Sequence, residues 1–115
     1  MWVLLGLIAL CQADQPAAVE AFNTAIDKAD KMLVLSPENY DSWDSKGLSL
    51  CGLALCENNK NRVLDAVRAF RKARSINRDQ GHIKRTMRLL NSITQMDTAD
   101  MLQSAKTALS EYVAV

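Results

Sequence analysis

The chain has 115 residues and a formal net charge of +1, with 49% hydrophobic and 23% charged residues. This length suits one domain and excludes a two-domain enzyme, and the composition is that of a folded globular chain, not a disordered one. Four glycines, two prolines and 5% aromatic residues are too few for the many tight turns of an all-β domain. We therefore predict an all-α protein with a single domain over residues 1–115.

The chain opens with an apolar run over residues 1–13. One interpretation is a buried first helix, and the alternative is a signal peptide, which would make the protein secreted or periplasmic. The run contains no Lys or Arg, although signal peptides begin with a positive segment, and it is too short to span a bilayer. The favoured interpretation is a first helix in a cytoplasmic protein without a membrane span.

Five further segments alternate with short polar breaks. Between Ala18 and Leu33 apolar residues recur at three- and four-residue steps, which predicts an amphipathic helix. Ser36 and Pro37 should end this helix and begin the next one, because serine is a good N-cap and proline fits the first turn. Further helices are expected over about residues 39–56, 63–76, 83–93 and 102–112. Because the breaks are short, successive helices should be antiparallel.

The positive charge is concentrated in one block, since residues 60–88 contain ten basic and two acidic residues. This block indicates an alternative function, the non-specific binding of nucleic acid or of an acidic partner. The only aromatic residue in it is Phe70, which we expect in the core, so the block offers no ring on which bases could stack. Nucleic acid is therefore the less favoured partner.

The sequence contains no pattern typical of catalysis or of metal binding. It has no glycine-rich phosphate loop and no pair of histidines, and we expect its single histidine, His82, to be exposed and without a role. Cys51 and Cys56 are five residues apart in a predicted helix, about 140° from a common face, which is poor geometry for one metal ion. We expect no enzymatic activity, no cofactor and no metal.

Two stretches of the chain share an order of aromatic and small residues. They are Trp2, Leu5, Gly6, Ala18, Phe22 and Ala25, then Trp43, Gly47, Ala66, Phe70 and Ala73. This order resembles the tetratricopeptide repeat, whose signature recurs over ~34 residues. In such a pattern glycine and alanine let two helices approach closely, and phenylalanine fills the space between one hairpin and the next.

The resemblance implies antiparallel helical hairpins stacked as a short superhelix. The expected units are repeat 1 over about 1–36, repeat 2 over about 37–78 and a capping helical pair over about 79–115. Trp2 and Trp43 are 41 positions apart and Phe22 and Phe70 are 48 apart, more than the ~34 of the family. We therefore expect the second and third helices to be elongated.

The resemblance also implies a function in protein recognition. A tetratricopeptide-like stack is a scaffold or adaptor that binds a peptide or a partner helix in its concave groove, lined by the first helix of each pair. By motif position and helical stripe the groove residues would be Val3, Leu7, Leu10, Asp41, Asp44, Leu48, Cys51, Lys84 and Arg88. Lys84 and Arg88 are one turn apart and could hold a carboxylate or pair with Asp41 and Asp44. The uncovered side of the apolar opening helix further predicts self-association.

Overall fold

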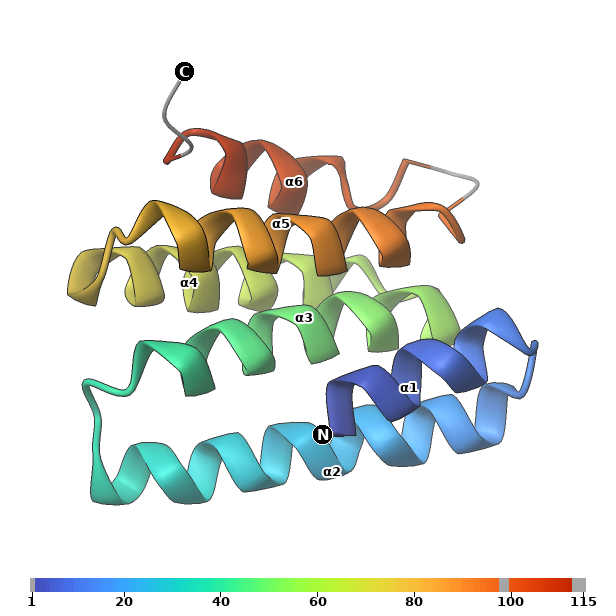
Figure 1. The fold of residues 1–115 in the computed structure, drawn as a ribbon. Coiled ribbons are helices and arrows are strands. Elements are labelled where there is room, and N and C mark those ends of the chain that lie inside the picture. Colours follow the sequence, from blue (N-terminus) through green and yellow to red (C-terminus); the bar gives the residue numbers. More distant parts are fainter. Residues whose placement is uncertain (1, 98–99, 113–115) are drawn as a thin grey trace.

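The computed structural model describes residues 2–97 and 100–112, and every regular element within them is a helix. The predicted all-α class is therefore confirmed (Figure 1). The helices are α1 (Trp2–Cys11), α2 (Gln15–Leu35), α3 (Tyr40–Glu57), α4 (Lys60–Ile76), α5 (Gln80–Thr94) and α6 (Gln103–Ser110). None of them is long and apolar enough to cross a membrane.

Aspartate and asparagine side chains begin four of the helices. Asp14, Asn39, Asn59 and Asp79 each accept a hydrogen bond from a backbone N–H in the first turn of α2, α3, α4 and α5 respectively. These N–H groups have no partner within the helix, so each cap stabilises its helix by about 1 kcal/mol. The prediction that Ser36 begins the third helix is wrong. Ser36 follows the last residue of α2, and Asn39 caps α3.

Contacts between glycine and phenylalanine set the spacing of the first four helices. A Cβ atom added to Gly6 of α1 would lie 2.5 Å from the ring of Phe22 on α2, and one added to Gly47 of α3 would lie 2.7 Å from the ring of Phe70 on α4. Both rings are fully buried. Phe22 also lies against Gly52 of α3, so its ring fills the space between the α1–α2 pair and α3. The side chain of Trp2 lies outside the described structure.

The first hairpin is lopsided because α1 has 10 residues and α2 has 21. At 1.5 Å per residue these helices are roughly 15 and 31 Å long. Figure 1 shows that α1 lies beside only the first half of α2 and leaves the second half next to α3 alone. Helices α2 and α3, the two expected to be elongated, are the longest in the described structure, with 21 and 18 residues.

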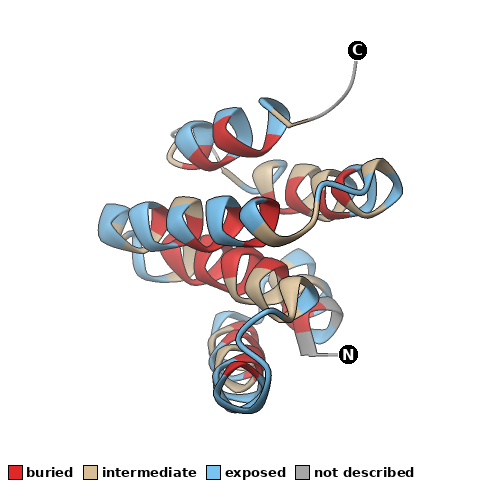
Figure 2. Ribbon diagram, turned by 90° about the vertical axis from the view of Figure 1, so that its left-hand side faces the viewer, coloured by how far each residue is buried: buried red, intermediate tan, exposed pale blue. Residues whose placement is uncertain are grey.

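Helix α3 is the centre of the molecule. It contacts α1, α2, α4 and α5, and all residues from 47 to 54 are buried. Figure 2 shows the buried positions gathered where α3 and α4 face each other, with the outer helices exposed on their far sides. Helix α6 packs on α4 and α5 and closes the other end of the core.

Candidate functional site

A groove crosses α3 between α2 and α5, at the N-terminal end of α1. It consists of two adjoining cavities that share Val3 of α1 and Ser45 of α3. The larger cavity, of about 210 Å³, lies between α2 and α3, and the smaller, of about 40 Å³, lies between α3 and α5. We call the two cavities together the groove.

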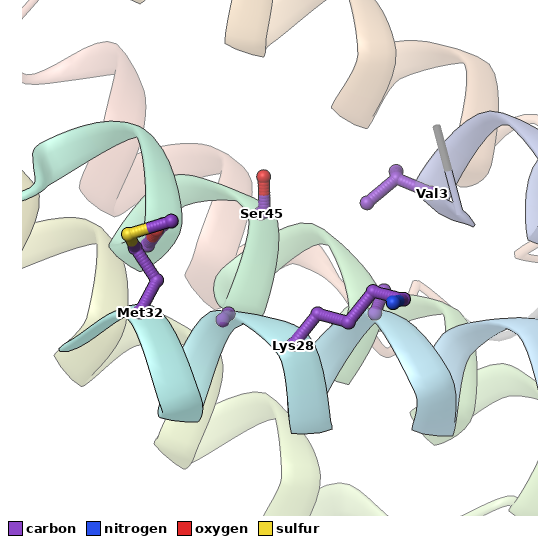
Figure 3. A pocket seen from close by; sticks show the side chains of 7 residues that line it. Val3, Lys28, Met32 and Ser45 are labelled. Carbon is purple, nitrogen blue, oxygen red and sulfur yellow. The ribbon is translucent and has the colours of Figure 1, made fainter. Parts of the chain in front are cut away.

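The larger cavity exists because α1 is too short to cover the second half of α2. Ala25 and Ala29 of α2 are buried beneath it, and Met32, on the same helix, is 45% exposed at its edge. Figure 3 shows Met32 and Lys28 projecting from α2, with Ser45 of α3 and Val3 of α1 around the same space. The lining is mostly apolar, and a single Lys contributes the positive charge.

A buried ion pair lies beneath the smaller cavity. Nη2 of Arg74 on α4 is 2.5 Å from Oδ2 of Asp44 on α3, and the two side chains are 0% and 2% exposed. Nε2 of His82 on α5 is 2.6 Å from the same carboxylate oxygen. The ring of Tyr40 meets the imidazole edge to face, with the ring centroids 4.9 Å apart. One carboxylate therefore links three helices.

The surroundings of Asp44 have opposing effects on the pKa of its carboxyl group. Burial raises the pKa of Asp44, whereas the positive charge of Arg74 and the hydrogen bond and charge from His82 oppose that rise. The loss of hydration is the largest effect, because a buried carboxylate lacks the water that stabilises its charge. The contacts of Asp44 with Arg74 and His82 hold α3, α4 and α5 in one arrangement. A buried ion pair is in general weak evidence for added stability.

The structure brings four of the expected groove residues to the groove. Val3 lines both cavities, and Asp41, Asp44 and Leu48 line the smaller one. Leu7 and Leu10 are partly buried against the hydrophobic core and line neither cavity.

Cys51 faces the interior of the protein. It is completely buried, and burial, together with the charge of Asp97, raises the pKa of its thiol. The expectation that it lines the groove is therefore corrected: it is a core residue of α3.

Lys84 and Arg88 do not face Asp41 and Asp44. Both are exposed on α5, but they lie roughly 120–160° around the helix from His82 and line neither cavity. Their place in the groove is taken by other α5 residues, namely His82, Arg85, Thr86 and Leu89. The expected pairing of Asp44 with Lys84 or Arg88 is wrong, since Asp44 pairs with Arg74 and His82.

The expectation that His82 is exposed and without a role is also wrong, because its side chain is only 12% exposed and contacts Asp44. A signal for the network exists in the sequence. Asp44 lies three residues before Gly47, and Arg74 lies four residues after Phe70, so both charges fall on apolar stripes and need buried partners.

The basic block of residues 60–88 does not form one continuous charged surface. Arg74 is buried with Asp44, Arg62 forms an ion pair with Glu57 at 3.0 Å, and Arg71 lies 3.7 Å from Glu111. Some of its positive charge is therefore neutralised within the fold.

The described residues contain no group of three or more His, Cys, Asp and Glu side chains placed to hold a metal ion. Comparisons of the chain with protein-family models, with curated proteins and with solved structures find no significant match.

Proposed function

We propose that the protein is a scaffold or adaptor that binds a peptide or a helix of a partner protein in the groove. The observation that supports this most strongly is the lopsided first hairpin. Because α1 stops halfway along α2, the facing sides of α2 and α3 border an apolar cavity of about 210 Å³ instead of a covering helix. A concave, largely apolar space with a few polar groups is the usual form of a peptide- or ligand-binding site.

The repeated sequence pattern supports the same function. The groove is bordered by α1, α3 and α5, the first helices of the three successive hairpins, and also by α2, which contributes four of the seven residues that line the larger cavity. In tetratricopeptide-like proteins the first helices form the peptide-binding side. The polar groups nearest the smaller cavity are Asp41, His82 and Arg85, which would orient a bound chain beside the apolar cavity.

The experiment is a selection of binders from a random peptide library, followed by affinity measurements on two variants. Met32→Glu places a charge at the edge of the larger cavity, whereas Val34→Glu places the same charge on the same helix outside the groove, at a residue that is 82% exposed. We expect Met32→Glu to weaken the selected peptides about tenfold or more, because an apolar anchor would have to pack against an unpaired charge. Val34→Glu should bind like the wild type. Equal binding by both variants would show that the groove is not the site.

A second proposal concerns self-association through α1. Leu5 and Ile8 are 49% and 52% exposed, and together with Ala17 and Ala21 they border a shallow hollow of about 390 Å³ between α1 and α2. Apolar patches of this kind often mark contact surfaces. Sedimentation at increasing protein concentration should reveal dimers that Ile8→Glu abolishes. A wild type that stays monomeric at all concentrations refutes this proposal.

We further propose a cytoplasmic location. Cys11, Cys51 and Cys56 are free thiols, which suits a reducing compartment. Removal of residues 1–13 as a signal peptide would also take away Gly6 and leave the ring of Phe22 uncovered on that side. Mass measurement of the protein isolated from its native cells tests this, since a chain that lacks the first residues would favour secretion.

A further inference from the structure

A second cleft, of about 660 Å³, lies between α2 and α4. Trp43, Lys46 and Leu50 are the α3 residues that line it, and they lie roughly half a turn around α3 from the groove residues Asp41 and Ser45. The cleft and the groove therefore occupy opposite sides of the same helix.

The floor of the cleft is apolar. Ile26 of α2, Leu50 of α3 and Ala69 of α4 form it together with the ring of Trp43. The indole N–H of Trp43 donates a hydrogen bond of 3.0 Å to the carbonyl oxygen of Pro37, so the polar group of this side chain is already satisfied. Nζ of Lys46 lies over the ring, 5.6 Å from its centroid, so the indole contributes apolar surface to the cleft next to a positive charge.

The rim of the cleft is basic and extended. Lys46 lies on α3, and Arg62, Arg68 and Lys72 follow one side of α4. From Arg62 to Lys72 the helix rises roughly 15 Å. The positive charges are thus spread along the cleft and do not converge on one point.

Two carboxylates also line the cleft, and both already have basic partners. Asp30 accepts a hydrogen bond of 2.7 Å from Nζ of Lys46, and Asp65 lies 3.6 Å from Nη1 of Arg68. Solvent-exposed pairs of this kind are weak and exchange partners easily. Lys72 forms no ion pair with any residue that the structure describes. Arg62 is also paired, at 3.0 Å, with Glu57, which lies outside the lining. Four cations against these three carboxylates leave a net charge of +1 along the cleft, and Lys72 carries it.

We propose that this cleft docks an acidic amphipathic helix from a partner protein. The apolar side chains of such a helix, spaced at i, i+3 or i+4, and i+7, would lie on the floor, and its carboxylates would face Arg62, Arg68 and Lys72. Charges spread over roughly 15 Å match carboxylates along two or three helical turns better than a single phosphate group. A nucleic-acid strand would need several stacking rings, and the cleft contains only Trp43.

The cleft and the groove together would let the protein hold two partners on opposite sides of α3. This inference does not depend on the proposed function, because the two sites share no lining residue. Binding at either site can be abolished by a substitution that leaves binding at the other site intact.

The test uses binders selected from a random peptide library against the full chain and sorted by their response to variants. We expect one class of acidic, amphipathic peptides whose affinity falls about fivefold or more in Lys72→Glu and in Arg68→Glu, and falls as salt is added. Lys106→Glu is the matched control, because it makes the same charge change at an exposed residue of α6 away from the cleft. This class should be insensitive to Met32→Glu, the variant that tests the groove.

Several results would overturn the inference. One is a set of binders of which none is weakened by Lys72→Glu, and another is an equal loss of affinity in Lys106→Glu, which would indicate net charge alone. Equal binding by peptides of the same composition in scrambled order would show that no amphipathic helix is recognised. Displacement of the acidic peptides by a labelled single-stranded oligonucleotide of higher affinity would assign the cleft to nucleic acid instead.

Discussion

Removal of the Arg74 guanidinium should destabilise the protein strongly. Arg74→Met keeps most of the side-chain length but leaves the carboxylate of Asp44, which is 2% exposed, with His82 as its remaining partner. Loss of one member of a buried ion pair costs about 3–5 kcal/mol. A domain of this length is stable by roughly 6–17 kcal/mol, so the variant should lose a large part of its free energy of unfolding.

Replacement of both partners should restore most of that loss. Asp44→Leu combined with Arg74→Met removes the two charges together, and such apolar replacements are often neutral or stabilising. The double variant loses few hydrogen bonds. Oδ1 of Asp44 and Nε and Nη1 of Arg74 have no hydrogen-bond partner among the described residues. We expect the double variant to be more stable than Arg74→Met by about 2 kcal/mol or more.

The measurement is urea denaturation followed by circular dichroism at pH 7 and pH 5. With a urea dependence of about 2 kcal/mol per molar, a loss of 3–5 kcal/mol lowers the midpoint by roughly 2 M. Burial already raises the pKa of Asp44, and loss of Arg74 raises that pKa further. A carboxyl group whose pKa is raised in the folded state binds a proton more readily there than in the unfolded chain, so the deficit relative to the wild type should shrink as the pH is lowered from 7 to 5.

Two results would refute this reasoning. The first is a loss below about 1 kcal/mol in Arg74→Met, since that would place the carboxylate in contact with water. The second is a double variant no more stable than Arg74→Met. That result would show that the loss of stability comes from altered side-chain packing and not from the unpaired charge of Asp44.

Two further predictions concern glycine and cysteine. Gly52→Ala should cost about 1–3 kcal/mol in the same urea assay, because its Cβ would lie 2.4 Å from the buried ring of Phe22, whereas Gly81→Ala, at an exposed position of α5, should be neutral or stabilising. A thiol reagent at pH 8 should modify exposed Cys11 quickly and leave Cys51 unmodified until the protein unfolds, because burial raises the pKa of that thiol. Peptide mass mapping checks this order, and rapid labelling of Cys51 would contradict it.

Patterns in the sequence were enough to predict the helices and the burial of two phenylalanines. The steps between apolar residues predict α2 and α4, and the order of glycine and phenylalanine predicts that Phe22 and Phe70 are buried, as the structure confirms. The helices are predictable because the helical period relates near neighbours along the chain. The burial of the two phenylalanines is predictable because a large apolar side chain avoids water wherever the chain places it. The N-cap of α3 is Asn39 and not Ser36, because local patterns determine helix ends less well than helix interiors.

Only the tertiary structure decided which charges meet and where the surface is hollow. Arg74 follows Asp44 by 30 residues and His82 follows it by 38, so their meeting depends on how α3, α4 and α5 pack together. The two open surfaces arise in the same way, since the groove follows from where α1 stops along α2, and the cleft brings Trp43 to a basic side of α4. The sequence by itself determined which residues are helical and which avoid water. The partner of each charge depends on distances between helices, which no local pattern contains.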